Sequence, residues 1–340
     1  MNDMKLHERI LHILKDNLLF IITIIIVFLI FTIQIPYEVE MPGGTINLNN
    51  RVTIDGNDIN VEGSYNMSYV ATVNGSIPYI LIGLINPDWE VVKTSEYVKD
   101  NESIEDYYNR NRIYLEQSKV FAEMSAYKAA GIEFKTTKQH NKIVYLTEES
   151  NSDLKIQDEI VKFGDIEEEL TSDKIIEYID SKQPGDEIDI VVERDNKEIN
   201  CKAKVYEEDG ENKIGMVVAI YYDIESDYNV DIKSKGSESG PSGGFMMSLM
   251  IYSGLTGKDL THGKKIVGTG TINSEGKVGE IGGIKYKIMG AVKDKADIFL
   301  VPEDNYEEAK NFVDKKNYDI ILVSVSKLED AINYLEGLDE

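Results

Sequence analysis

The chain has 340 residues, 29% of them charged, and a formal net charge of -25 at pH 7. This length exceeds what one hydrophobic core usually organises, so we expect more than one folded unit. The acidic balance argues against a nucleic-acid partner, because phosphate binding requires clustered Lys and Arg. Cys201 is the single cysteine, which excludes an intrachain disulfide, and the four histidines do not cluster at ligand spacing. We therefore predict no metal and no other cofactor.

An uncharged apolar run extends from Leu18 to Ile35. At about 1.5 Å per residue it spans roughly 27 Å, close to the hydrocarbon thickness of a bilayer, so we predict a transmembrane helix over 18–35. A cleaved signal peptide is the alternative, but no small-residue cleavage site follows the run. The prediction is therefore a retained membrane anchor.

The charges on either side of the run predict its direction. Lys5, Arg9 and Lys15 precede it, and no Lys or Arg follows until Arg51. Positive charge favours the cytoplasmic side of a membrane. We expect residues 1–17 to form a cytoplasmic tail and the rest of the chain to lie outside the cell, attached to the cell membrane by a single pass.

Residues 36–130 are predicted to form a sheet-rich lead-in and a long helix. The runs RVTIDGNDINVEG and YVATVNGSIPYILIGLI combine strand-like stretches with turn signals. From Asn101 to Ala130, apolar and aromatic residues recur at helical spacing, and Gly131 supplies a stop.

Residues 131–218 have a different pattern, with the strand IVYL, an acidic loop, the phrase FGDI and a helix near Ser172 to Ser181 for which Ser172 is a plausible N-cap. The turn Pro184-Gly185 and two further strands follow. This order resembles PDZ domains, in the version found in bacterial membrane proteases. The resemblance implies peptide binding by strand addition, although the loop TEESNSD lacks the usual glycine pair. A small structural α+β domain without a ligand is the alternative.

The segment GSESGPSGGFMMSLMIYSGLTG, which begins at Gly236, has a glycine-rich turn that leads into a predicted helix beginning near Ser242. Unpaired N–H groups and the helix dipole at such a position can stabilise an oxyanion, so Ser242 is a candidate nucleophile. An ordinary helix N-cap is the alternative for this serine. No GxxxxGK[ST] pattern occurs, so ATP binding is not predicted.

The sequence from about residue 231 to 335 contains an ordered set of motifs that resembles the proteolytic domain of Lon, a serine peptidase family with a Ser-Lys dyad. The motifs are GPSGG at Gly240, SGLTG at Ser253, GTGTI at Gly268, VGEIGGIKYK at Val278 and IFLVPEDN at Ile298. We therefore predict a Lon-type proteolytic domain over 219–340.

The resemblance implies a role for individual residues. The serine of the family's PSAG motif corresponds to Ser242, and the second lysine of its GG-x-K-x-K segment corresponds to Lys287. Lys285 is the first lysine of that segment, and helical periodicity does not decide between the two. Thr269 corresponds to the threonine that helps to orient the lysine.

The glycine-rich turn around the serine is expected to support catalysis through Gly240 and Gly243. The sequence departs from the family at Gly243, where PSAG has alanine, and at Glu280, where proline is common. Neither departure removes a reacting group.

Taken together, the segments resemble the bacterial membrane-anchored PDZ–Lon proteases. The expected fold is α+β, with an N-terminal transmembrane helix, a PDZ-like domain and a C-terminal Lon-type domain. The resemblance implies an ATP-independent serine endopeptidase that cleaves extracellular peptides or exposed protein segments through an acyl-enzyme. Its partners would be a peptide or protein substrate and the membrane, and assembly into a homo-oligomer is open. A non-catalytic surface scaffold that binds peptide tails is the alternative function.

Overall fold

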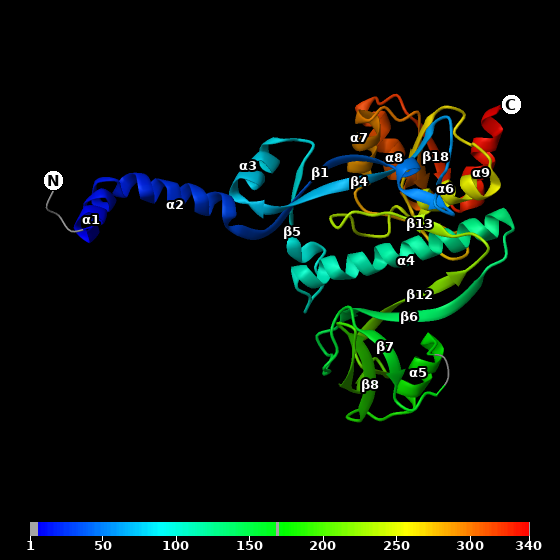
Figure 1. The fold of residues 1–340 in the computed structure, drawn as a ribbon, viewed down its shortest axis with the longest axis horizontal. Coiled ribbons are helices and arrows are strands. Elements are labelled where there is room, and N and C mark those ends of the chain that lie inside the picture. The colour runs from blue at the N-terminus through cyan, green and yellow to red at the C-terminus, as the bar shows by residue number, and fades with distance from the viewer. Residues whose placement is uncertain (1–5, 168–169, 340) are drawn as a thin grey trace. The chain divides into compact units, whose positions relative to one another are not determined.

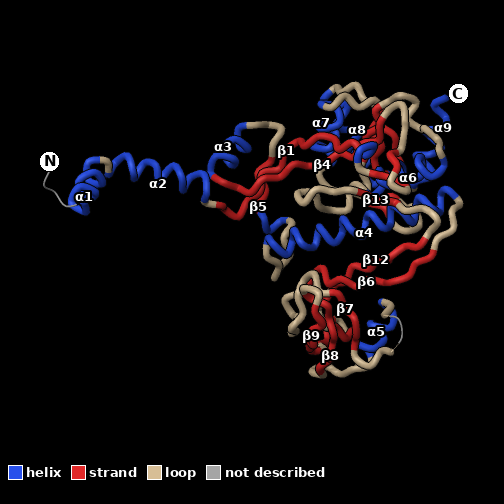
Figure 2. The backbone as a smooth tube through the Cα atoms, viewed as in Figure 1, coloured by secondary structure: helices blue, strands red, loops and turns tan. Residues whose placement is uncertain are grey.

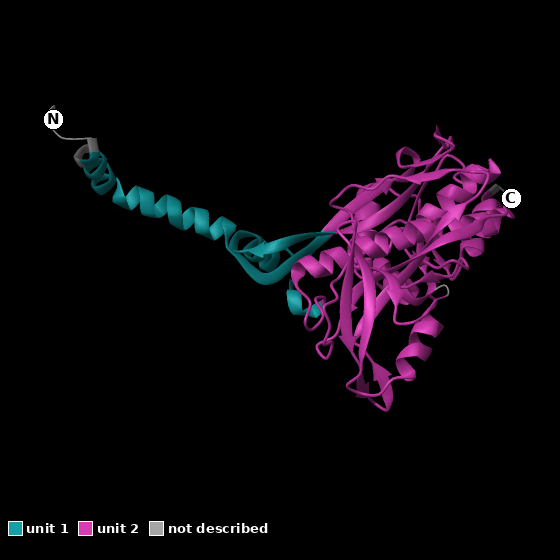
Figure 3. Cartoon of the chain, turned by 60° about the horizontal axis from the view of Figure 1, so that its bottom comes forward, with its two compact units in different colours: residues 1–41, 71–96 teal, residues 42–70, 97–340 magenta. Residues whose placement is uncertain are grey.

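The computed structural model describes residues 6–167 and 170–339, so Lys5 and the start of the predicted cytoplasmic tail lie outside the described residues (Figure 1). The chain divides into two compact units, drawn in different colours in Figure 3. Unit 1 contains residues 1–41 and 71–96, and unit 2 contains residues 42–70 and 97–340. Part of the predicted lead-in therefore belongs with the C-terminal residues.

Unit 1 begins with two helices, α1 (Leu6–Asp16) and α2 (Leu18–Thr32). Within the described part of the chain, no single helix is both long and apolar enough to cross a membrane. The pair Ile10–Asp16 and Leu18–Thr32, bent by 72°, meets these criteria together, by length and composition only.

The predicted transmembrane helix was wrong at its C-terminal end. Strand β1 (Gln34–Asn47) begins two residues after α2 ends, so Ile35 is extended rather than helical. A proline disfavours the helical conformation in the residue before it, and Ile35 precedes Pro36.

The rest of unit 1 is a small sheet and a short helix. The first part of β1 pairs antiparallel with β5 (Glu90–Lys93), and β4 (Ser64–Ser76) leads directly into α3 (Ile77–Ile85). The run YVATVNGSIPYILIGLI was predicted to be strand-like, and this prediction was wrong for its second half, which is helix α3. The segment IPYILIGLI has no polar alternation, and Pro78 in the first turn presets a helical φ angle.

A mixed sheet forms the centre of unit 2, with the strand order β18-β17-β14-β4-β1. The neighbours from β18 to β4 are parallel, and β4 adds to β14 through the register Lys265↔Ser64 to Gly268↔Met67. Sequence segments about 200 residues apart are thus paired in one sheet. The C-terminal strands are β14 (Lys265–Gly268), β17 (Ile298–Pro302) and β18 (Ile321–Val325).

Helices cover both faces of this sheet. Ile266 packs in a core with residues of α6 and α9, whereas its neighbour Val267 packs in a separate core with residues of α7 and α8. Adjacent strand residues point to opposite faces, so the arrangement is a mixed α/β layer structure. The helices are α6 (Gly244–Thr256), α7 (Ile284–Lys293), α8 (Glu303–Lys316) and α9 (Leu328–Glu336).

Two small sheets complete this part of unit 2, one with the strand order β13-β2-β3 and the other made by the pair β15 and β16. Their strands are β2 (Val52–Ile54), β3 (Asn57–Asp58), β13 (Val230–Ile232), β15 (Thr271–Ile272) and β16 (Val278–Gly279). Short 3-10 helices occur at Leu48–Asn50 and Gly337–Asp339 in unit 2 and at Thr94–Glu96 in unit 1.

The predicted PDZ-like region is an antiparallel sheet with the strand order β12-β6-β7-β8-β9 and its own hydrophobic core (Figure 2). The predicted boundary at residue 218 falls inside β12. The N-cap of α5 is Thr171, whose side chain accepts a hydrogen bond from Lys174 N–H, rather than the predicted Ser172. The elements are β6 (Lys135–Leu146), β7 (Glu159–Phe163), α5 (Ser172–Asp180), β8 (Glu187–Arg194), β9 (Lys197–Lys204), β10 (Tyr206–Glu208), β11 (Glu211–Lys213) and β12 (Met216–Glu225).

The predicted long helix is confirmed as α4 (Ile104–Ala130). Ser103 and Asp106 form a capping box at its start, and Gly131 ends it in the left-handed region with φ 69°. The helix contacts both α6 and β12. It therefore touches the C-terminal helices and the PDZ-like sheet at once.

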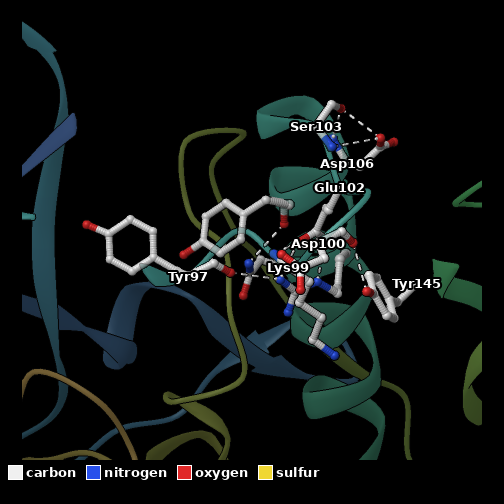
Figure 4. A network of polar contacts seen from close by, with 10 residues as sticks. Tyr97, Lys99, Asp100, Glu102, Ser103, Asp106 and Tyr145 are labelled. Atoms are coloured by element: carbon white, nitrogen blue, oxygen red, sulfur yellow. Dashed lines mark hydrogen bonds and ion pairs between the residues drawn. The ribbon is translucent and has the colours of Figure 1, made fainter. Parts of the chain in front are cut away.

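A polar network fixes the segment that leads into α4 (Figure 4). Arg110 donates hydrogen bonds to both carboxylate oxygens of Glu102, at 2.6 and 2.8 Å, and the Glu102 side chain is fully buried. Tyr145 of β6 donates a hydrogen bond of 2.8 Å to the Asp100 carbonyl. The start of α4 is thereby attached to the PDZ-like sheet.

Candidate active site

The nucleophile loop, defined as residues 240–244, lies between β13 and α6. Helix α6 begins at Gly244, and its N-cap is Gly243, with no side-chain capping hydrogen bond. Ser242 is therefore not the helix N-cap that the sequence left open as an alternative. Within the described residues, its hydroxyl group has no hydrogen-bond partner, and the residue is half-buried.

Three of the predicted residues are joined by hydrogen bonds. Lys287 Nζ donates to Thr269 Oγ1 at 3.0 Å, and Thr269 Oγ1 donates to the Ser242 carbonyl oxygen at 3.1 Å. The single hydrogen of the threonine hydroxyl is thus used on Ser242. It cannot also be donated to Lys287, so the lone pair of a neutral Lys287 amine stays available to accept a proton.

Lys287 lies in a setting that disfavours its charged form. The residue is 3% exposed, and burial lowers its pKa to about 7. In the described part of the chain, no carboxylate forms an ion pair with it. The neutral amine is therefore well populated near pH 7.

The structure separates the two lysines that helical periodicity could not. Lys285 is only half-buried, and its Nζ lies 4.7 Å from the centre of the Tyr286 ring. Lys287 occupies the buried face of α7 and reaches Thr269. Of the two, only Lys287 is linked by these bonds to the nucleophile loop.

Backbone pairing holds the loop against the segment after β14. Gly270 N–H donates to the Ser242 carbonyl at 2.8 Å, and Phe245 N–H donates to the Gly270 carbonyl at 3.2 Å. A side chain at Gly270 would meet Val278 at 2.7 Å, so this close approach requires glycine. The GTGT motif thus fixes the Ser242 backbone through Gly270 and places Thr269 beside the same carbonyl oxygen.

The start of α7 is clamped by an asparagine of the VPEDN motif. Asn305 accepts a hydrogen bond of 2.9 Å from Ile281 N–H and donates one of 3.1 Å to the Ile281 carbonyl. Gly283, with φ 69°, then turns the chain into the helix that carries Lys287. The motif has a structural task in positioning the lysine.

Helix α4 holds the other side of the nucleophile loop, through residues that the sequence did not identify. Gly240 N–H donates to the Asn111 carbonyl at 2.9 Å, and Ser118 Oγ donates to the Pro241 carbonyl at 3.0 Å. Gly240 has φ 87°, which favours glycine. Asn111 and Ser118 are seven residues apart, so they lie on the same face of α4, two turns from each other. This spacing is the only feature of the sequence that could have connected the two residues.

Strand β4 explains the departure from alanine at position 243. A Cβ atom built at Gly243 would lie 2.4 Å from Met67 Sδ. Such a separation is far inside van der Waals contact, so alanine at this position would require the Met67 side chain to move. The glycine leaves room for the side chain of Met67, which lies more than 170 positions earlier in the sequence.

The described residues contain no group of three or more His, Cys, Asp or Glu side chains that could hold a metal ion. The chemistry available at this position is that of a hydroxyl, a low-pKa amine and helix N-terminal amides.

Comparison with protein families matches residues 226–336 to the Lon protease (S16) C-terminal proteolytic domain. Over 98 residues the chain is 31% identical to the Lon protease of Neorickettsia sennetsu, covering 29% of this chain and 12% of that protein. It is 31% identical over 117 residues to the Lon protease of Halothermothrix orenii, covering 34% and 15%. It is 42% identical over 77 residues to that of Mesomycoplasma hyopneumoniae, covering 23% and 8%.

The chain thus spans only a small part of the length of these curated relatives. Residues 226–336 form a serine protease domain. This domain is of the Lon (S16) type, and it contains Ser242, Thr269 and Lys287.

Two solved structures are each similar to a quarter of the chain. One is the crystal structure of the PDZ domain of the SdrC-like protein from Listeria monocytogenes, at 21% identity, with 25% of this chain and 92% of that chain covered and a TM-score of 0.22. The other is the solution structure of the second domain of a Listeria protein, at 24% identity, with 25% and 88% covered and a TM-score of 0.21.

Proposed function

We propose that the protein is a serine endopeptidase in which Ser242 is the nucleophile and Lys287 the general base. The observation that carries this proposal is the buried Lys287, which has no carboxylate partner among the described residues and is connected through Thr269 to Ser242. A lysine can serve as a base only when neutral, and a pKa of about 7 makes that form available. A structural lysine would instead be paired with an acid.

In the proposed reaction, Lys287 takes the proton from the Ser242 hydroxyl while the serine oxygen attacks the scissile carbonyl. The new C–O bond gives a tetrahedral oxyanion, which Gly243 N–H and the N-terminal end of α6 stabilise. The C–N bond then breaks, and Lys287 returns the proton to the leaving amine. A water molecule then gives a proton to Lys287 and attacks the acyl carbon, the ester C–O bond to Ser242 breaks, and Lys287 returns the proton to the serine oxygen.

We place Thr269 as a positioning residue. Its hydroxyl accepts from Lys287 and donates to the serine backbone, so it fixes the amine relative to the nucleophile without exchanging a proton with substrate. Gly240 and Gly243 support the loop through their backbone conformation and the space they leave.

We further propose that the apolar segment that contains α2 anchors the protein in the cell membrane, with the N-terminal residues cytoplasmic and the protease domain outside. The apolar helix α2, which belongs to the bent pair, supports the anchor, and the Lys and Arg residues before Leu18 support this orientation. The absence of a GxxxxGK[ST] pattern in the 340 residues supports cleavage without ATP. The substrates would be extracellular peptides or exposed protein segments.

The segments predicted from the sequence complete the proposal. We assign 1–17 to a cytoplasmic tail, 18–35 to the membrane segment, 36–130 to the lead-in and long helix, 131–218 to a PDZ-like domain and 219–340 to the Lon-type domain. The PDZ-like domain would bind peptides by adding a strand to its sheet.

The test compares the full chain with its Ser242→Ala and Lys287→Ala variants on casein and on secreted peptides, with and without ATP. We expect cleavage by the wild type alone, at a rate that ATP does not change. Circular dichroism and thermal melting check that the variants are folded. If all three proteins are equally inactive on every substrate while still binding peptides, the non-catalytic scaffold is the better account.

A further inference from the structure

Helix α3 of unit 1 is apolar along its whole length, yet its side chains are exposed. Its sequence is IPYILIGLI, and Gly83 is its only buried residue. Leu84 is 71% and Ile85 is 83% exposed. A helix that is apolar all round is normally covered by protein or by lipid. In the structure, protein covers little of α3.

The one covered face of α3 shows how the helix is seated. A Cβ atom at Gly83 would lie 2.7 Å from Val91 and 3.2 Å from Val39, so the helix backbone rests on the β1 and β5 layer of unit 1. The glycine allows this close approach. The large apolar side chains therefore lie on the remaining surface of the helix, away from the sheet.

The helix lies beside the exit of the proposed membrane anchor. Within unit 1, α3 contacts α2 (Figure 1). Gly75, just before α3, packs on the backbone of Tyr37, where a Cβ atom would lie 2.5 Å from the Tyr37 carbonyl oxygen. Tyr37 follows the end of α2 by five residues, which span at most about 17 Å of strand.

The surrounding sequence has the composition of a segment at a membrane interface. Residues 63–87 contain no Asp, Glu, Lys or Arg, in a chain with 29% charged residues. Tyr79 of α3 is 44% exposed, and Trp89 follows the helix by four residues. Tyrosine and tryptophan are enriched where hydrocarbon meets headgroups.

We propose that α3 is a second membrane contact, a helix that lies in the lipid interface on the outer side of the bilayer. Nine residues span only about 14 Å, too short to cross the hydrocarbon, so the helix lies along the interface. The occupant of its exposed surface is phospholipid. This inference rests on the proposed anchor, because α3 reaches the bilayer through its position beside α2. It would hold unit 1 to the membrane at two points.

Trp89 provides the measurement, since the chain contains one tryptophan. The full chain is reconstituted into phosphatidylcholine vesicles in which part of the lipid is brominated on its acyl chains. We expect at least twofold quenching of Trp89 emission, stronger with bromine near the headgroup than near the bilayer centre. The double variant Leu84→Asp and Ile85→Asp should lose at least half of this quenching and remain in the vesicles after carbonate washing.

Ile176→Asp is the matched control, because Ile176 is 56% exposed on α5, in the PDZ-like region of unit 2. Trp89 emission in this variant should be quenched to the same extent as in the wild type. An unquenched Trp89 in a wild-type chain that resists carbonate would overturn the inference while leaving the anchor intact. Equal quenching in the double variant would also overturn it. Extraction of the wild type by carbonate would instead refute the anchor itself, and the inference with it. Trp89 emission that depends on protein density rather than bromine would assign the surface to a second copy of the chain.

Discussion

The side-chain nitrogen of Lys287 lies 3.0 Å from the hydroxyl oxygen of Thr269, and this hydroxyl donates its own hydrogen to the backbone of Ser242. The direction of these two bonds matters more than their length. Because the threonine donates toward the serine backbone, it can only accept from the lysine. The amine is thereby held in place while its lone pair stays free, as the proposed role of Lys287 as a base requires.

Removing the Thr269 hydroxyl should slow catalysis without removing a reacting group. We expect Thr269→Val to lower kcat about tenfold, because one hydrogen bond to an ionisable group contributes roughly 1.5 kcal/mol. Thr269→Ser keeps the hydroxyl and should retain most of the activity. Steady-state kinetics of both variants, with KM compared, check this role. A Thr269→Val protein as active as the wild type, or a Thr269→Ser protein as slow as Thr269→Val, would contradict the role of the hydroxyl.

Lys287 should reduce the stability of the folded protein. Its folded pKa of about 7 lies below the usual value of 10.5, so between these pH values the unfolded chain binds more protons and stability rises with pH. Replacement by methionine should therefore stabilise the protein by roughly 1–4 kcal/mol near pH 7. The advantage should shrink toward pH 10.

Urea unfolding of the wild type and Lys287→Met at pH 7 and pH 9.5 measures this difference. Lys285→Met is the control, and its effect should be small at both pH values, because Lys285 is only half-buried. A Lys287→Met protein less stable than the wild type at pH 7 would contradict the assigned burial of a neutral lysine.

Ser118 should act on the nucleophile loop from outside the matched protease domain. We expect Ser118→Ala to lower kcat roughly fivefold with little change in KM, since the Pro241 carbonyl loses a hydrogen bond worth about 1 kcal/mol. Ser125 is the matched control. It is equally buried on α4, but its hydroxyl bonds to Ala122 of its own helix. If Ser125→Ala and Ser118→Ala have the same kinetics, the loop does not depend on α4.

The fit between Gly243 and Met67 predicts a compensating pair. Gly243→Ala should lower activity roughly fivefold or more, because the added methyl overlaps Met67 Sδ and forces this side chain or the loop to shift, at a cost of about 1–3 kcal/mol. Met67→Ala removes the obstacle, so the double variant should be more active than Gly243→Ala alone. Additive losses in this double-mutant cycle would contradict the contact.

The sequence predicted the residues of the candidate active site better than the residues that hold the nucleophile loop in place. Ser242, Thr269 and Lys287 could be named from ordered local motifs, and the structure brings them together. The contacts of Asn111, Ser118 and Met67 could not be predicted, because they join the loop to residues more than 100 positions away. No local periodicity encodes such a pairing.

The fold shows the same division between local and distant information. Helix α4 was predicted from its spacing and from Gly131, which are local signals. The parallel pairing of β4 with β14 was not predicted, because parallel strands are joined by long connections that leave no local signal in the sequence. Helix α3 was mistaken for a strand because a short apolar run has no distinctive period.

Covalent labelling with a peptidyl fluorophosphonate, followed over pH, tests the nucleophile and the base most directly. The account predicts one adduct, located on Ser242 by mass spectrometry, with a labelling rate that rises through pH 7 and then levels as Lys287 loses its proton. Ser242→Ala should give no adduct, and the folded Lys287→Met protein should react at least a hundredfold more slowly. An adduct on another residue, or a Lys287→Met rate equal to that of the wild type, would contradict the Ser242 and Lys287 pair.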